Sequence, residues 1–315
     1  MSFLENIKNK RVHVVGLAGQ EGRAVFEYFL DLGIENLYAH ERSSQEDFKK
    51  NFLSYSDAYT SCEAQKLLQK ILKFPSKLYF QEDYLSGIKK GDVVIVPQSY
   101  RRYPENQTLL KKAKNGEITL KQAIELVFEI APCPIIGVTG TLGKSTVASL
   151  IAHILKNSSR KVYFSGNDRE DKWDLVSLSK IPKNALAVLE ISNRHLIDLR
   201  QSPHIGILNN LYPHHLDEHF SFSDYVKTKK RIFSYQGKKD FAVIDFELLK
   251  KDLVKKEEIK GQLLTFGLIN QSDAFVKKRA LYLIKEGKEI KIVDLQEVPL
   301  KGRENYKNLQ SAALS

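Results

Sequence analysis

The sequence predicts an α/β protein with two domains, each built on a mostly parallel sheet. Three observations lead to this prediction. The chain has 315 residues, more than one typical domain requires. Apolar runs of strand length alternate with helical patterns along most of it. A strand, a glycine-containing loop and a helix also follow one another twice, beginning near residue 11 and again near residue 134.

The composition is that of a globular protein, and a cytoplasmic location is expected. No apolar run approaches the about 20 residues of a membrane span, and the N-terminus lacks the pattern of a signal peptide. Cys62 and Cys133 are too few for a disulfide framework or a metal cluster. The net charge of +11 is scattered over predicted helix faces without interleaved aromatic residues. This pattern favours a solvated surface over a nucleic-acid partner, although the field would assist an anionic substrate.

The first domain begins like a Rossmann unit. Residues 11–15 form the predicted strand and residues 24–32 the helix, and the loop between them contains Gly16, Leu17, Gly19 and Gly22. Further strands are expected at residues 36–39, 77–80 and 92–96. The carboxyl ends of parallel strands face one crevice, which is where open α/β sheets bind ligands.

A nicotinamide-binding function is an alternative for this segment alone. Ala18 replaces the middle glycine of the dinucleotide fingerprint and the loop is one residue longer, so the motif is weak. Glu41, at the end of the second strand, could supply the acid that such a site requires.

The second domain is predicted to begin with an amphipathic helix at residues 119–130, which leads into its first strand. We place the first domain at residues 1–115 and the second at 116–301, with residues 302–315 opening a further domain. Strands are expected at residues 134–138, 161–164, 186–191, 205–209 and 241–244, with short β segments between 262 and 299. Helices are expected at residues 147–155 and 222–233.

The most informative motif lies between the strand at 134–138 and its helix. Glycines occur every third residue before a lysine and a serine, which is a variant of the P-loop. Backbone N–H groups and the helix N-terminus would hold phosphate, the lysine would reach the terminal phosphates, and the serine could bind Mg²⁺. A glycine turn that merely connects strand and helix is the alternative. The predicted nucleotide-binding residues here are Gly140, Thr141, Gly143, Lys144, Ser145 and Thr146.

Two further strand ends carry candidate metal ligands. Glu190 ends one apolar run, and His215 follows the next strand, so both belong at the carboxyl edge of the sheet. With phosphates, they could complete the shell of Mg²⁺ or Mn²⁺. Three neighbouring histidines also leave zinc open, although no cysteine is nearby. Lys229 lies on the next predicted helix, and by itself it is typical of a surface lysine.

Several ordered motifs together resemble the Mur ligase family over essentially the whole chain. The motifs are residues 137–146, 189–192 and 210–217, a Gly-Asn turn at 166–167, and the segment at 302–308. Tyr225 and Lys229 match the helix whose lysine the family carbamylates. The family pattern is altered at three positions, where Leu142 replaces asparagine, His214 replaces aspartate and Glu304 replaces histidine. Arg194 and His195 also differ from the usual pair.

The resemblance, nearest to the branch that adds D-glutamate to UDP-N-acetylmuramoyl-L-alanine, implies a function. It implies ATP-dependent amide-bond formation through an acyl phosphate, as part of peptidoglycan precursor synthesis, by a monomer. Lys144, His215 and Lys229 would be catalytic. Metal ligands would be Ser145, Glu190, His215 and carbamylated Lys229, and Asn305 would bind ATP. The substrate would contact Gly16, Leu17, Gly19, Gly22, Glu41, Arg42, Asn167 and Ser192.

The resemblance also implies that the family's closing domain, which carries the amino-acid site, would begin where this sequence stops. We therefore expect little or no turnover from the 315 residues alone. Another ligase of the same superfamily and a non-catalytic nucleotide-binding protein remain alternatives, and a P-loop kinase is a weaker one.

Overall fold

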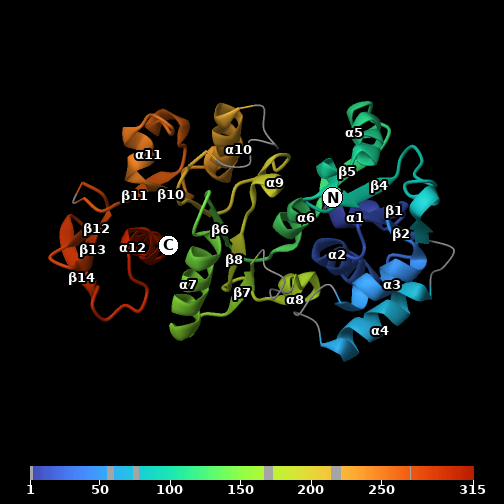
Figure 1. Ribbon diagram of the computed structural model, residues 1–315, viewed down its shortest axis with the longest axis horizontal. Coiled ribbons are helices and arrows are strands. Elements are labelled where there is room, and N and C mark those ends of the chain that lie inside the picture. Colours follow the sequence, from blue (N-terminus) through green and yellow to red (C-terminus); the bar gives the residue numbers. More distant parts are fainter. Residues whose placement is uncertain (1–2, 55–59, 74–77, 167–172, 214–220, 270) are drawn as a thin grey trace. The chain divides into compact units, whose positions relative to one another are not determined.

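The structure, a computed structural model, forms two compact units (Figure 1). It describes residues 3–54, 60–73, 78–166, 173–213, 221–269 and 271–315. The first unit contains residues 1–130 and 168–180, and the second contains residues 131–167 and 181–315. Each unit is built on a largely parallel sheet covered by helices, which confirms the predicted fold class.

The first unit has a parallel five-stranded sheet in the order β3-β2-β1-β4-β5. Its strands are β1 (Val12–Val15), β2 (Leu37–Glu41), β3 (Leu78–Phe80), β4 (Val93–Val96) and β5 (Thr119–Gln122). Its helices are α1 (Phe3–Ile7), α2 (Gln20–Asp31), α3 (Gln45–Ser54), α4 (Ser61–Leu72), α5 (Gln107–Lys114), α6 (Ala123–Ile130) and α8 (Leu175–Lys180). Strands β1 and β4 are buried along their whole length, which explains their nearly continuous apolar sequences.

The expected boundary between the units differs from the observed one. Residues 119–130 do not form one helix: Thr119–Gln122 is strand β5, which pairs with β4, and α6 follows it directly. The apolar pattern over this stretch combines a strand and a helix. Both elements belong to the first unit, so the chain passes to the second unit after residue 130, not after 115.

A chain of buried polar groups crosses the core of the first unit. His13 Nε2 lies 2.9 Å from Asp92 Oδ2, and His13 Nδ1 lies 2.8 Å from His40 Nε2. Both imidazoles are fully buried, and they stack on Tyr38 and Tyr79 respectively. Burial lowers the pKa of His13 to about 4, against the opposing effect of Asp92, and burial also lowers the pKa of His40 to about 3. Both side chains are therefore neutral in the folded unit.

The second unit has a nine-stranded sheet in the order β14-β13-β12-β11-β10-β9-β6-β8-β7. Neighbouring strands are parallel from β7 to β12, and the last three are antiparallel, so the predicted strands and short β segments are confirmed. The bounds are β6 (Ile135–Thr139), β7 (Val162–Ser165), β8 (Leu186–Glu190), β9 (Ile205–Leu208), β10 (Phe241–Asp245), β11 (Gln262–Phe266), β12 (Ala274–Lys277), β13 (Ala280–Lys285) and β14 (Lys288–Asp294).

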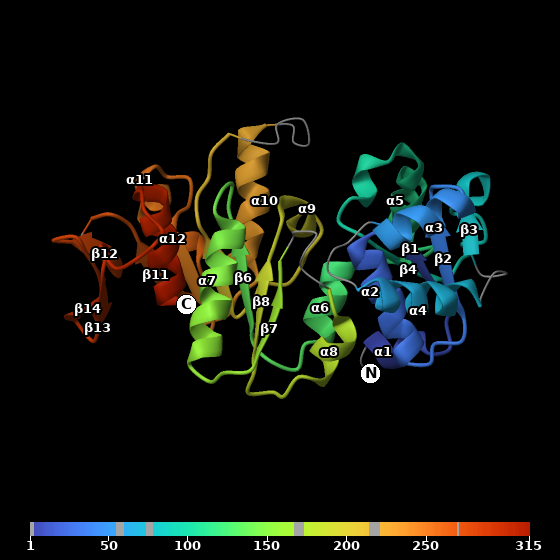
Figure 2. The same cartoon turned by 60° about the horizontal axis from the view of Figure 1, so that its bottom comes forward.

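Helices cover both faces of this sheet. They are α7 (Lys144–Asn157), α9 (Asn193–Leu196), α10 (Phe222–Ser234), α11 (Phe246–Lys250) and α12 (Arg303–Leu314). Helices α7 and α12 lie side by side (Figures 1 and 2). The core beneath them includes Ile136, Val138 and Ala312. Residues 302–315 therefore group with the second compact unit, into which α12 packs.

Helix α10 packs closely against two central strands because they carry glycines in register. Gly137 of β6 pairs with Gly206 of β9. A Cβ atom on Gly206 would lie 2.6 Å from the carbonyl oxygen of Ile232 in α10, and one on Gly137 would lie 2.7 Å from Ile191 Cδ1. Gly206 therefore admits the backbone of α10, and Gly137 leaves room for side chains, including that of Ile232 in α10.

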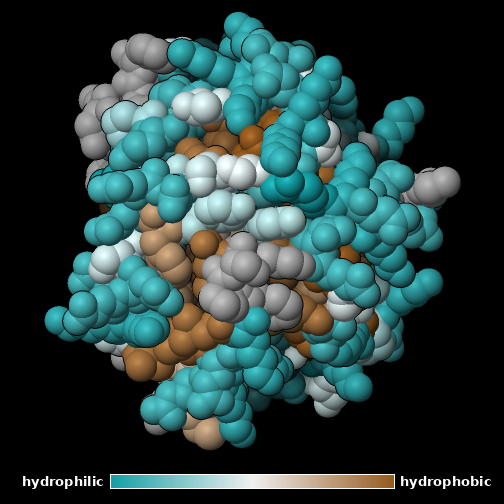
Figure 3. Space-filling model, turned by 90° about the vertical axis from the view of Figure 1, so that its right-hand side faces the viewer, coloured by the Kyte–Doolittle hydropathy of each residue, from teal (hydrophilic) through white to brown (hydrophobic). Residues whose placement is uncertain are grey.

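Hydrophilic residues cover most of the face shown in Figure 3, and hydrophobic residues gather toward its middle. Among the residues that the structure describes, none of the helices has the length and apolar character needed to span a membrane.

We expect Gly206→Ala to destabilise the second unit by about 1–3 kcal/mol, because the added methyl group must displace α10. Gly237→Ala is the matched control, since the nearest atom to its added Cβ would be 3.8 Å away. Urea denaturation followed by circular dichroism measures both variants. Equal free energies of unfolding for the two would contradict the close packing of α10.

The buried histidines should make the first unit sensitive to acid. Above pH 6.5 both imidazoles are neutral in the folded and the unfolded chain. Below pH 6.5 the unfolded chain takes up protons that the folded unit cannot, so the free energy of unfolding should fall toward pH 4, by at most about 2.7 kcal/mol per pH unit for two groups. Fluorescence of Trp173, the single tryptophan and a buried residue of this unit, reports its unfolding in urea.

His40→Phe removes one of these groups and should have a shallower acid dependence. His153→Gln, an exposed substitution in the second unit, should leave the dependence unchanged. The explanation is wrong if His40→Phe and the unsubstituted chain lose stability in parallel.

Candidate functional site

The loop between β6 and α7 has the form that the sequence predicted. Gly143, at the N-cap of α7, has φ +78°, and a Cβ there would lie 2.5 Å from Asn308 Oδ1. Only glycine suits both the conformation and the space. No side chain among the described residues caps α7, so the backbone N–H groups of its first turn remain available. Such a helix N-terminus attracts anions.

Lys144 is the first residue of α7, and its side chain folds back onto the loop. Its Nζ donates to the carbonyl oxygen of Thr141 at 3.1 Å. Burial lowers the pKa of Lys144, and the nearby carboxylate of Glu190 partly opposes this shift. Ser145, the next residue, is exposed in the first turn of α7, and Thr146 is half-buried there. The two hydroxyl groups therefore lie at the helix end where phosphate would bind.

Lys229 reaches the same loop from α10 on the opposite face of the sheet. Its Nζ donates to Thr139 Oγ1 at 3.1 Å and to the carbonyl oxygen of Gly140 at 3.2 Å, and its side chain is 2% exposed. Burial, reinforced by the charge of Lys144, lowers the pKa of Lys229 to about 7, while Glu190 acts in the opposite direction. A substantial fraction of this amine is therefore uncharged near neutral pH.

Glu190 lies at the end of β8 and is 4% exposed. Its Oε2 atom is buried without a hydrogen-bond partner in the described structure. Buried carboxylate oxygens are normally paired, so this atom has unused capacity to bind a cation or a donor. Lys144, Glu190 and Lys229 thus interact electrostatically around one loop, which three separate sequence motifs had predicted.

Several predicted residues have other contacts or cannot be located. His215, His214 and Asn167 lie outside the described residues. Ser192 caps helix α9, because its Oγ accepts the N–H of His195 at 3.2 Å and its own N–H reaches His195 Nδ1. Asn305 donates to the carbonyl oxygen of Lys301 at 2.9 Å, in the first turn of α12.

Sequence reasoning did not predict the polar contacts that hold the loop in place. Thr141 Oγ1 lies 3.0 Å from the hydroxyl of Tyr225 and accepts the N–H of Tyr212 at 2.9 Å. Asn209 and Asn210 contact the loop from the end of β9. Asn210 directly follows the strand expected at residues 205–209, but this local pattern does not show which groups of the loop it contacts.

A cavity of about 300 Å³ lies in the first unit, at the carboxyl ends of β1, β2 and β4. Predicted residues that line it are Gly16, Gly19, Glu41 and Arg42. The unpredicted lining includes Tyr84, Tyr103 and Asn106.

Glu41 and Arg42 have specific partners in this cavity. Glu41 Oε2 accepts the N–H of Ala18 at 2.8 Å, which fixes the glycine loop. The Arg42 guanidinium lies 3.9 Å from the centre of the Tyr103 ring and pairs with Glu105 at 2.8 Å. With these two contacts, Arg42 lies in the lining of the cavity, where an anionic or planar ligand could reach it.

Two predicted loop residues serve packing instead. Leu17 is buried in the core. A Cβ on Gly22 would lie 2.2 Å from the carbonyl oxygen of Gly16, so Gly22 lets α2 approach the loop.

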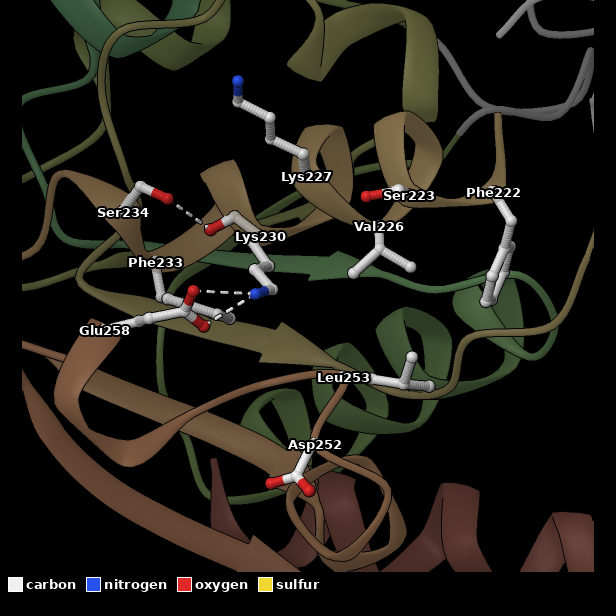
Figure 4. Close-up of a pocket in the computed structure, with 10 residues that line it drawn as sticks. All are labelled: Phe222, Ser223, Val226, Lys227, Lys230, Phe233, Ser234, Asp252, Leu253 and Glu258. Carbon is white, nitrogen blue, oxygen red and sulfur yellow. Dashed lines mark hydrogen bonds and ion pairs between the residues drawn. The ribbon is translucent and has the colours of Figure 1, made fainter. Parts of the chain in front are cut away.

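A cavity of about 650 Å³ also lies along the outer side of α10 (Figure 4). Val226 and Leu253 provide apolar lining, and Lys230 forms an ion pair with Glu258 at 2.7 Å. Among the described residues predicted for the site, none lines this cavity. It is separate from the loop at the N-terminus of α7.

The fold and the loop together define an α/β protein with a P-loop-like helix N-terminus. Residues 138–315 match the family model for the Mur ligase middle domain. The chain belongs to the Mur ligase family.

Curated relatives include UDP-N-acetylmuramoylalanine–D-glutamate ligases. The enzyme from Clostridium acetobutylicum is 28% identical over 98% of this chain and 62% of its own length. The enzyme from Caldanaerobacter subterraneus subsp. tengcongensis is 29% identical over 98% of this chain and 63% of its own length. The chain therefore spans less than two thirds of these relatives.

Solved structures share the fold at low sequence identity. UDP-N-acetylmuramate–alanine ligase from Thermotoga maritima gives a TM-score of 0.53 at 17% identity, over 96% of this chain and 64% of that one. UDP-N-acetylmuramate:L-alanyl-gamma-D-glutamyl-meso-diaminopimelate ligase from Neisseria meningitides gives a TM-score of 0.58 at 13% identity. This match covers 97% of this chain and 92% of that one.

Proposed function

We propose that this chain supplies the nucleotide-binding and UDP-substrate-binding units of an ATP-dependent ligase. The ligase would add D-glutamate to UDP-N-acetylmuramoyl-L-alanine during peptidoglycan precursor synthesis. The observation that carries the proposal is the meeting of Lys144, Glu190 and Lys229 around the uncapped N-terminus of α7. The similarity of 28% over 98% of the chain to D-glutamate ligases supports the choice of substrate.

The proposed reaction has two steps. A carboxylate oxygen of the UDP substrate attacks the γ-phosphorus of ATP, so that a P–O bond forms to the acyl oxygen and ADP leaves. The amino group of D-glutamate then attacks the acyl carbon, loses a proton and displaces inorganic phosphate. Lys144 and the N–H groups of α7 would hold the phosphates in place and balance their charge, which is the main contribution a protein makes to phosphoryl transfer.

The oxygen atoms at the site suit Mg²⁺. Glu190 offers a buried carboxylate oxygen that has no partner, and Ser145 offers an exposed hydroxyl at the helix end. The described residues contain no cluster of three or more His, Cys, Asp or Glu side chains that could hold a metal, so phosphate oxygens would complete the shell, as is usual for Mg²⁺. When bound, the ion would neutralise charge on the phosphates. A second ion would use His215 and a carbamate on Lys229.

Carbamylation of Lys229 is consistent with its surroundings. The uncharged amine can attack CO₂, forming an N–C bond and releasing a proton, which turns a cation into an oxygen ligand. The lowered pKa of about 7 provides the uncharged amine near neutral pH. A carbamate anion would also relieve the repulsion between Lys229 and Lys144.

The cavity at the edge of the first sheet is the proposed site for the uridine diphosphate part of the substrate. Arg42 supplies a cation beside the ring of Tyr103, at the carboxyl ends of the strands that line the cavity. Other ligases of the superfamily, and a non-catalytic nucleotide-binding protein, are the competing functions.

We expect the chain to bind UDP-N-acetylmuramoyl-L-alanine about tenfold more tightly than UDP-N-acetylmuramate, a difference of about 1.4 kcal/mol in calorimetry. Arg42→Ala should weaken both by about tenfold through loss of a charged contact. Arg160→Ala, an exposed arginine of the second unit, should change neither. Equal affinity for both compounds would contradict the D-glutamate assignment, and binding of Mg·ATP alone would favour the non-catalytic alternative.

With ¹³C-labelled bicarbonate, we expect a carbamate resonance in the ¹³C NMR spectrum that increases as the pH rises through about 7, because only the uncharged amine reacts. Lys229→Arg should abolish the resonance. Lys227→Arg, an exposed position of the same helix, should preserve it. If the unsubstituted chain gives no resonance with Mg²⁺ and nucleotide present, Lys229 is not carbamylated.

A further inference from the structure

Asparagine side chains hold the tip of the phosphate loop by hydrogen bonds to backbone groups of Leu142. Asn210 Oδ1 accepts the N–H of Leu142 at 2.8 Å, and Asn210 Nδ2 donates to the carbonyl oxygen of the same residue at 3.0 Å. Asn209 Nδ2 donates to that carbonyl oxygen as well, at 3.1 Å. The side chain of Leu142 is 56% exposed and takes no part in these contacts. Two consecutive asparagines therefore secure one exposed loop residue.

Asn210 also determines which N–H groups of the loop remain available. The N–H of Thr141 is directed at Asn210, 3.0 Å from its Oδ1 and 3.1 Å from its carbonyl oxygen. With Leu142 bound in the same way, two successive N–H groups point toward the end of β9. The following N–H groups, from Gly143 onward, belong to the open end of α7.

Asn209 connects the loop to α12. Its Nδ2 donates to Asn308 Oδ1 at 2.8 Å, and its Oδ1 accepts from Ser311 Oγ at 3.5 Å. Asn209, Asn210 and Asn308 are 1%, 4% and 5% exposed. Buried amide groups with several partners hold a fixed geometry, because breaking one contact leaves a polar atom unpaired.

We propose that Asn209 and Asn210 are positioning residues that fix the phosphate loop in its binding shape before nucleotide arrives, and that Asn308 anchors them to α12. This inference rests on the proposed function, since nucleotide is the ligand that the loop would receive. A loop ordered in advance does not lose further conformational entropy on binding, so the affinity for nucleotide is higher.

An amide is required at position 210 because both an acceptor and a donor are used. The oxygen accepts two backbone N–H groups, and the nitrogen donates to a backbone carbonyl. Of the side chains of this size, only asparagine carries both functions on one plane. Alanine would remove all three contacts and leave the shape of the strand intact.

The experiment measures the dissociation constant of Mg·ATP by calorimetry on the full 315-residue chain. Asn210→Ala should weaken binding by about tenfold or more, and Asn209→Ala by about two- to fivefold because Asn210 still holds the carbonyl oxygen of Leu142. Asn157→Ala, an exposed amide at the other end of α7, is the matched control and should bind as the unsubstituted chain does. Circular dichroism at the same temperature establishes that each variant is folded.

Amide hydrogen exchange supplies a readout that general destabilisation would not reproduce. In Asn210→Ala, exchange at Leu142 should be selectively faster, because its N–H loses its acceptor, whereas the N–H of Thr141 keeps the backbone carbonyl oxygen of residue 210 and the N–H groups of β6 and β9 remain protected. With Mg·ATP bound to the unsubstituted chain, the N–H of Leu142 should stay protected and still depend on Asn210. Protection of this group by nucleotide in Asn210→Ala as well would show that it binds phosphate instead and would overturn the proposal.

Two results distinguish failure of the positioning role from failure of the proposed nucleotide-binding function. If the unsubstituted chain does not bind Mg·ATP, the proposed function and the positioning role both fail. If it binds and the folded Asn210→Ala variant binds within twofold of it, only the positioning role fails. Should Asn210→Ala not fold, Asn209→Ala decides the question by the same two measurements.

Discussion

The arrangement of the second unit depends on how closely α10 approaches the sheet. Gly137 and Gly206 lie side by side on the two central strands; Gly206 leaves room for the helix backbone, and Gly137 leaves room for the side chain of Ile232 in that helix. From this helix, Lys229 reaches Thr139 Oγ1 and the carbonyl oxygen of Gly140. Gly137, the first glycine of the motif, lies within β6 and contributes to this packing through the space it leaves for Ile232. The P-loop motif and the lysine helix thus meet at the same point.

The buried charges near the loop are unbalanced in a way that suits an anionic ligand. Two lysines lie near one carboxylate, and burial lowers the pKa of both amines. A buried cation without a full counter-charge is costly, and it becomes less costly when phosphate arrives. The unpaired oxygen of Glu190 is the opposite case, because this buried acceptor has no hydrogen-bond partner in the described structure and could pair with a cation or a donor. The polar groups of this site are arranged for partners that the chain itself does not provide.

Much of the fold could be predicted from the sequence, because strands buried on both faces give apolar runs and the loop motif has fixed neighbours. The prediction failed at 119–130, where a strand and a helix without a turn between them give one continuous apolar pattern. The packing of α12 on α7 and on distant strands could not be predicted, because these contacts leave no local signal in the sequence. Lys144, Glu190 and Lys229 could be found by motif. The contact between Asn209 and Asn308 could not, since 99 residues separate the two in sequence and only the fold makes them neighbours.

The departure of Leu142 from the family pattern becomes understandable in these terms. What the structure uses at that position is the N–H and the carbonyl oxygen, both bound by asparagines from β9, and the side chain is exposed. A residue that acts through its backbone tolerates a change of side chain, provided its φ and ψ are accessible. Glycine at position 143 is different, because a Cβ atom there would collide with Asn308. The identity of a loop residue is therefore constrained where its side chain would occupy space that α12 needs, and free where only its peptide group is bound.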